Sequence, residues 1–152
     1  MSQNPKPMSV KSRKGFTLVE LAVVIVIIGV LAAFGVPKFL NSVERSKAAE
    51  AVAYLSAVRT AEERYIALQG IYATDVTSLD ISIPAPKYFD VATSITTTNT
   101  ATSPTWSLTL TRKTATSSFG GYTVTFTQDG FDTANSTIAS DATLAVINPF
   151  GT

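Results

Sequence analysis

The stretch KGFTLVE, residues 14–20, runs directly into LAVVIVIIGVLAAFGV, residues 21–36. Between Phe16 and Val36 the only polar side chains are those of Thr17 and Glu20. As an α-helix this run is about 31 Å long, which matches the roughly 30 Å hydrocarbon core of a bilayer. The sequence therefore predicts a membrane-spanning helix over residues 16–37.

Charge is distributed unevenly about this run. Four cations and no acidic residue precede it: Lys6, Lys11, Arg13 and Lys14. A basic flank of this kind stays on the cytoplasmic side, so we expect a single-pass membrane protein whose bulk is exported. The rest of the chain is mildly acidic and offers no broad basic face for phosphate contacts. No nucleic acid is therefore predicted as a primary partner.

The chain contains neither Cys nor His. This absence excludes thiolate and imidazole metal sites, Cys nucleophiles and His-based acid–base catalysis. Asp75 and Asp80 resemble a catalytic pair only in their proximity along the chain, because no oriented base or nucleophile accompanies them. We expect no enzymatic activity and no cofactor, and we assign these carboxylates to turns and caps.

A second, amphipathic helical segment is expected over residues 38–69. Its apolar stripe recurs at helical spacing and comprises Leu40, Val43, Ala51, Leu55, Val58, Ala61, Tyr65 and Leu68. Mostly away from this stripe we place the charged residues Glu44, Arg45, Glu50, Arg59, Glu62 and Glu63. Gly70 is suited to a left-handed cap, so the helix is expected to end near Gln69.

Residues 70–152 have the composition of strands and turns. Three segments alternate apolar and polar residues and predict an antiparallel sheet with one wet face: Phe89–Ile95, Trp106–Leu110 and Tyr122–Phe126. We expect a hairpin connection over 113–121, a turn at Asp129–Gly130, a last strand over Leu144–Ile147, and an irregular connector over 70–86 that packs back onto the sheet. The predicted fold is α+β, with a long N-terminal helix packed on a C-terminal antiparallel sheet.

Residues 14–20 resemble the processing signal of type IV pilins and of the related pseudopilins of type II secretion. The resemblance continues from Leu21 to Asn41 and includes Gly29 and Pro37 within the apolar helix. It implies a basic leader, residues 1–15, that prepilin peptidase removes by cutting between Gly15 and Phe16. It further implies N-methylation of Phe16 and assembly of a homopolymeric filament through the N-terminal helices.

Glu20 is the residue whose position needs a physical explanation. A carboxylate at the centre of a spanning helix costs about 2.5–3.5 kcal/mol on insertion scales, and less near the ends. Cleavage after Gly15 would create a cationic amine on Phe16, about one helical turn away, which a neighbouring subunit's Glu20 could meet. Such a pair could set the axial register of subunits. The alternative is that Glu20 simply reaches the membrane interface.

Gly29, Gly35 and Pro37 weaken the helix in one region, because Pro lacks a backbone donor and Gly has low helix propensity. In related filaments this stretch loses helical order on assembly, so we expect a break or kink between Gly29 and Pro37. A plain bend where the helix leaves the membrane is the alternative.

Other interpretations have weaker support in the sequence. A secretory signal cut near Ala32-Ala33 and Gly35 would have a shorter apolar region and would discard Glu20. Oxygen ligands for calcium occur in one loop, but their spacing matches no known loop pattern and no metal is assigned: Asp129, Asp132, Asn135 and Asp141.

The favoured function is a structural subunit of a type IV pilus, a surface filament for adhesion, motility or DNA uptake. Its partners would be copies of itself, prepilin peptidase, the pilus assembly machinery and, before assembly, the membrane. The precursor would lie in the inner membrane and the assembled pilus outside the cell. The alternatives are a pseudopilin in a periplasmic pseudopilus, and a single-pass protein whose exported part acts alone.

Overall fold

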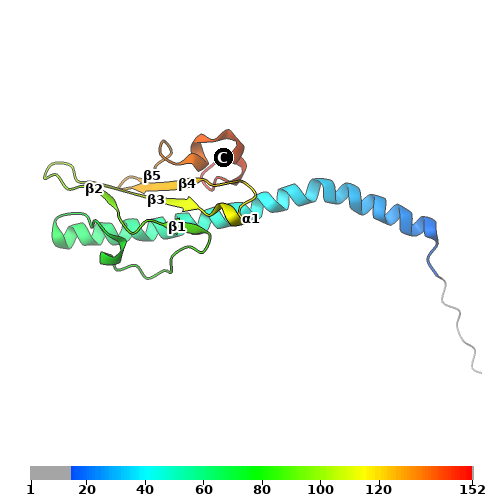
Figure 1. The fold of residues 1–152 in the computed structure, drawn as a ribbon, viewed down its shortest axis with the longest axis horizontal. Helices are drawn as coiled ribbons and strands as arrows, with labels where there is room; N and C mark the ends of the chain where they lie inside the picture. The colour runs from blue at the N-terminus through cyan, green and yellow to red at the C-terminus, as the bar shows by residue number, and fades with distance from the viewer. Residues whose placement is uncertain (1–14, 152) are drawn as a thin grey trace, which may run out of the picture. The chain divides into compact units, whose positions relative to one another are not determined.

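The computed structural model describes residues 15–151, so most of the expected leader lies outside the described residues. Helix α1 (Leu18–Gln69) dominates the fold (Figure 1). It begins two residues later than expected, because Thr17 forms its N-terminal cap. It ends as expected at Gly70, which has a φ of +78° and donates its amide to the Ile66 carbonyl at 2.8 Å. The chain forms two compact units that divide after Pro37, and the second unit is called the head below.

The head contains one antiparallel sheet, as the sequence predicts. Its strands are β1 (Phe89–Val91), β2 (Thr96–Thr98), β3 (Thr105–Arg112), β4 (Thr123–Thr127) and β5 (Gly130–Phe131). The order is β1-β3-β4-β5, and β2 also pairs with β3. Residues 113–121 connect the antiparallel pair β3 and β4, and Asp129–Gly130 turns the chain into β5, which confirms both predicted connections.

The first predicted strand, Phe89–Ile95, is only partly correct, because β1 ends at Val91 and β2 begins at Thr96, beyond the predicted end. Strand β1 pairs with one part of β3, through Phe89 and Arg112, while β2 pairs with another part, through Thr96 and Ser107. Between them Ser94 forms a bridge with Asp75. Between β1 and β2 the chain therefore pairs with the connector and not with β3. The alternation of residues along the sequence does not predict this pairing.

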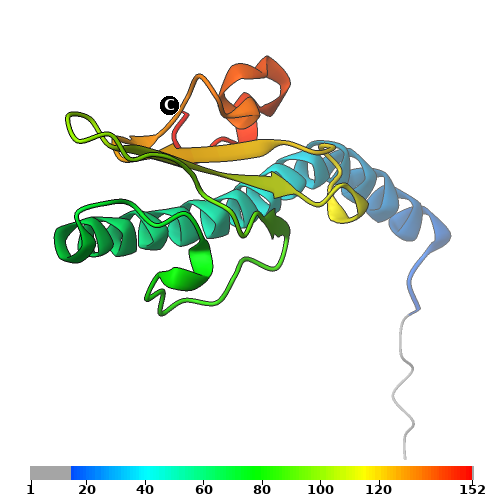
Figure 2. The same cartoon turned by 60° about the vertical axis from the view of Figure 1, so that its left-hand side comes forward.

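The core lies between the sheet and the second half of α1, which run side by side in the head (Figures 1 and 2). Alternate residues of β3 are buried: Trp106, Leu108, Leu110 and Arg112. On α1, Ala51, Leu55 and Val58 are fully buried as expected, whereas the predicted stripe residues Leu40 and Leu68 are exposed. The α+β fold is confirmed.

Short helical turns complete the head: η1 (Val76–Ser78), η2 (Thr114–Thr116), α2 (Thr137–Ser140) and η3 (Ala142–Ile147). The predicted strand over Leu144–Ile147 is wrong, since this segment forms η3. Asp141 accepts the Thr143 amide at 2.8 Å and caps it. The outer edge of β4 is already occupied, because Ser136 and Thr137 accept the amides of Thr125 and Thr123. Residues 144–147 therefore cannot pair with β4 as a further strand.

Candidate assembly site

The start of α1 is a reciprocal capping arrangement. The Thr17 amide donates to Oε2 of Glu20 at 2.8 Å, and the Thr17 hydroxyl donates to the same oxygen at 2.8 Å. In return the Glu20 amide donates to the Thr17 hydroxyl oxygen at 3.2 Å. A Thr at the cap and a Glu three residues later satisfy two amide donors that the first helical turn leaves unpaired.

This arrangement gives Glu20 a local role in capping the helix, which was not among the roles predicted from the sequence. The pattern Thr-x-x-Glu ahead of an apolar run is itself a signal for such a cap, and it is present at residues 17–20. The helix dipole also favours a negative charge in the first turn. Phe16 is exposed, and Gly15 has no neighbour within 4 Å of an added Cβ. Their roles in processing stay predictions.

The first half of α1 presents an apolar surface that no described part of the chain covers. Every large hydrophobic residue from Phe16 to Leu40 is exposed. Among the described residues α1 is the helix long and apolar enough to cross a membrane, and its apolar window has a mean hydropathy of 2.8. An apolar surface of this extent marks a membrane or a protein interface.

Gly29, Gly35 and Pro37 all lie within the continuous helix α1. An added Cβ at Gly29 or Gly35 would meet nothing within 4 Å, so contacts within this chain do not require a glycine at either position. The expectation that this segment breaks or kinks on assembly stays a prediction.

Glu44 and Arg112 form a buried ion pair that fastens the sheet to α1. Nε of Arg112 donates to Oε1 of Glu44 at 2.6 Å, and Nη2 donates to Oε2 at 3.2 Å. The Tyr122 hydroxyl donates to Oε1 at 3.0 Å, and Nζ of Lys47 donates to Oε2 at 3.1 Å. The remaining guanidinium donors bond the Tyr88 carbonyl and other oxygens nearby. Both charges are therefore well satisfied.

Burial and hydrogen bonding act in opposite directions on Glu44. Burial by itself raises the pKa of this carboxyl, but the hydrogen bonds from Arg112, Lys47 and Tyr122 outweigh it and bring the pKa below the ordinary 4.5. Burial would likewise lower the pKa of Arg112, but Glu44 outweighs this effect and raises it. The pair is therefore charged at neutral pH.

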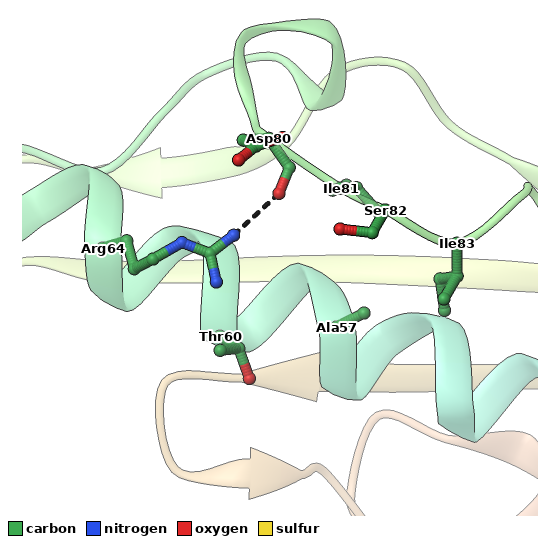
Figure 3. Close-up of a pocket in the computed structure, with 7 residues that line it drawn as sticks. All are labelled: Ala57, Thr60, Arg64, Asp80, Ile81, Ser82 and Ile83. Carbon is green, nitrogen blue, oxygen red and sulfur yellow. Dashed lines mark hydrogen bonds between the residues drawn. The ribbon is translucent and has the colours of Figure 1, made fainter.

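A groove of about 220 Å³ lies between α1 and the connector in the head (Figure 3). Its lining comprises Ala57, Thr60, Arg64, Asp80, Ile81, Ser82 and Ile83. Nη2 of Arg64 donates to the Asp80 carbonyl at 2.7 Å and joins its two walls. Asp75 accepts the Thr77 amide and caps η1, which confirms its expected capping duty.

Comparison with known proteins gives the family of the chain. Residues 10–36 match the family described as the prokaryotic N-terminal methylation motif. Residues 44–143, more than half of the chain, match the family described as pilin (bacterial filament). The chain belongs to the pilin family. No solved structure matches this pilin.

Curated relatives each match part of this pilin. A fimbrial protein of Pseudomonas aeruginosa is 45% identical over 56 residues, which cover 37% of this chain and 36% of the relative. The type IV major pilin protein PilA of Myxococcus xanthus is 42% identical over 60 residues, covering 40% and 27%. The type IV major pilin protein PilE of Neisseria gonorrhoeae is 36% identical over 70 residues, covering 46% and 42%. Each match therefore spans less than half of the relative's own length.

The prediction that Glu44 and Glu62 lie mostly away from the apolar stripe of this pilin is wrong for both residues. Their exposed fractions are 2% and 0%. The buried face follows the spacing 44, 48, 51, 55, 58 and 62, so each glutamate stands at one end of it. This alternation of four and three residues is the signal that would have found them.

The acidic loop residues serve as turn-forming groups in the pilin head. Asp132 accepts the amides of Ala134 and Asn135, and Asp141 accepts that of Thr143. Over residues 15–151, no three acidic side chains gather where they could hold a metal ion. The geometry of the described residues therefore does not support the alternative of a calcium site in this loop.

Proposed function

We propose that this pilin is the structural subunit of a type IV pilus. The observation that carries the proposal is the uncovered apolar half of α1. It begins at the Thr17–Glu20 cap, within the residues 10–36 that match the N-terminal methylation motif. The names of the relatives, fimbrial protein and type IV major pilin, support it. A filament in which these helices pack together would remove the apolar surface from water.

The precursor is held in the inner membrane by residues 16–37, with its head exported. Prepilin peptidase cuts between Gly15 and Phe16, and the new amine of Phe16 is methylated. Removal of the leader also removes four cations that would otherwise accompany the helix into an apolar filament core. The assembly machinery then adds subunits, and the heads form the outer surface for adhesion, motility or DNA uptake.

The capped geometry is compatible with pairing between subunits. Both hydrogen bonds from Thr17 end on Oε2 of Glu20, and among residues 15–151 Oε1 accepts none. A carboxylate has about four acceptor positions, so Oε1 can receive the amine of Phe16 from a neighbour while Thr17 stays bonded. This pair neutralises two charges inside the helix bundle. If one subunit shifts by one residue along its neighbour, the pair is lost and both charges stay buried without a partner, so the pair selects the axial register of the subunits.

The role of the subunit in this proposal is structural and not catalytic. The chain has neither Cys nor His, and the groove between α1 and the connector contains no paired nucleophile and base among its lining residues. The feature that calls for a partner is instead the exposed apolar surface of residues 16–40.

The decisive experiment shears the cells, images the filaments and measures the mass of their subunit. We expect surface filaments whose subunit begins at methylated Phe16. Material confined to the periplasm would instead indicate a pseudopilus. An intact precursor in the filament would contradict the proposed processing.

Two variants separate processing from register. Glu20→Ala is expected to leave membrane insertion and cleavage intact and to yield no homopolymer, whereas Glu63→Ala, at an exposed position of the same helix, assembles normally. Gly15→Val is expected to block cleavage, whereas Gly35→Val leaves it unchanged. Normal filaments from Glu20→Ala would refute the role in register, and mature mass from Gly15→Val would refute the cleavage position.

A further inference from the structure

Glu62 is a buried carboxyl that the assembly proposal does not use. It lies near the end of α1 with an exposed fraction of 0%. Its Oε2 accepts the amide of Ala73 at 2.9 Å, which joins α1 to the connector. Its Oε1 has no hydrogen-bond partner within the described residues. A charged carboxylate in this position would lack most of the bonds that offset its removal from water.

The charged groups near the end of α1 do not compensate a negative charge on Glu62. From α1 come Arg59 and Glu63, and Nε of Arg59 is already shared between Glu63 at 3.3 Å and the Gln128 carbonyl at 3.0 Å. The turn between β4 and β5 contributes Asp129, a second negative charge, which helps to raise the pKa of Tyr72. The neighbouring charges thus include two anions and one committed cation.

The connector and β3 contribute groups without charge at neutral pH. Tyr72 is buried, and its ring meets that of Trp106 edge-on at 6.5 Å. Burial raises the pKa of Tyr72, and the negative charges of Glu63 and Asp129 raise it further, so the phenol is neutral at neutral pH. Nε1 of Trp106 is buried and has no partner within the described residues. The surroundings of Glu62 therefore favour its uncharged form.

We propose that Glu62 is a pH-operated latch on the connector. As an uncharged carboxylic acid it stays buried and holds the Ala73 amide, and as a carboxylate it moves to water and releases residues 70–86. The groove in Figure 3 has the connector as one wall, so release opens this face of the head. The latch is independent of the proposed pilus function, because it needs only the head.

The sign of the pH effect follows from proton linkage. Burial raises the pKa of Glu62 above the ordinary 4.5, and the hydrogen bond from Ala73 offsets only part of this rise. The latched state therefore binds the proton more tightly than the released state. Latching is strongest below about pH 4.5 and weakens, by at most about tenfold per pH unit, as pH rises through the raised pKa.

The test uses the full chain in detergent micelles and two measurements. Hydrogen exchange, corrected for intrinsic rates, reports the protection of residues 70–86 from pH 4.5 to pH 9. The fluorescence of Trp106, the single tryptophan of the chain, reports its contact with Tyr72. We expect protection of the connector to fall with pH in step with a change in emission, while β3 and β4 stay protected.

Matched variants identify the titrating group. Glu62→Gln keeps the side-chain length and an acceptor for Ala73, so its connector should remain protected at every pH. Glu62→Met, a second neutral variant, should likewise lose the pH dependence. Glu63→Gln should behave as the unmodified chain. The latch is overturned if the unmodified chain shows no pH-dependent release, if Glu62→Gln keeps the original slope, or if the sheet loses protection together with the connector.

Discussion

Removing the Glu44 carboxylate should be among the most damaging single changes to the head. Glu44→Ala leaves the guanidinium of Arg112, which is 1% exposed, buried without its counter-charge. Breaking one partner of a buried ion pair costs about 3–5 kcal/mol. At about 4 °C of melting temperature per kcal/mol for a domain of this size, the melting temperature should fall by about 12–20 °C.

The assay is thermal unfolding of the full chain in micelles, followed by circular dichroism. The exposed pair Arg59–Glu63 on the same helix is the matched control, since its side chains are 41% and 58% exposed. Exposed pairs of this kind contribute about 0.3–0.5 kcal/mol, so Glu63→Ala should lower the melting temperature by no more than about 2 °C.

A double variant distinguishes a buried charge from lost packing. Glu44→Met combined with Arg112→Met replaces the pair by apolar groups of similar length and should recover most of the stability that Glu44→Ala loses. If Glu44→Ala is no worse than Glu63→Ala, the proposed anchoring of the sheet by this pair is refuted. If the double variant is as unstable as the single one, the damage comes from packing and not from charge.

Three further outcomes are expected from the same unfolding assay. Because the pKa of Glu44 in the folded state lies below 4.5, its contribution to the free energy of unfolding is present above about pH 4.5 and is lost as pH falls through that pKa. The Glu44→Met, Arg112→Met double variant lacks this titration, so its stability should fall less steeply with acid. Gly130 has a φ of +109°, so Gly130→Ala should cost about 1–3 kcal/mol, and an unchanged melting temperature would contradict the turn geometry. Leu55→Ala should cost about 2–5 kcal/mol because Leu55 is fully buried, whereas Leu68→Ala should stay within about 0.5 kcal/mol; equal effects would show that the core is misplaced.

Local patterns were sufficient where the interaction itself is local. The long helix follows from periodicity and from Gly70, whose left-handed conformation ends it. Strand β3 follows from alternation, because one of its faces is buried and the other is at least partly exposed. Strand β4 also follows from alternating residue types, but the predicted wet face is wrong there, because Thr125 is buried and bonds Ser136 and Asn135.

Predictions failed where the result depended on parts of the chain that are distant in sequence. Leu144–Ile147 has the composition of a strand but forms η3, because Ser136 and Thr137 already bond the outer edge of β4. The helical spacing predicts that Glu44 lies mostly away from the apolar stripe, and a carboxylate is normally solvated. It is buried because Arg112, 68 residues away, supplies two of its bonds.

The sequence by itself determined the N-terminal signal, the apolar helix and the α+β fold, because each rests on neighbouring residues and their spacing. The segment from Lys14 to Glu20 therefore pointed to the pilin family before any tertiary contact was considered. Only the tertiary structure decided that Glu44 is charged and paired and that Glu62 is buried without a cation. Both glutamates lie on one helix face, and the difference between them arises from which distant strand or loop packs against each.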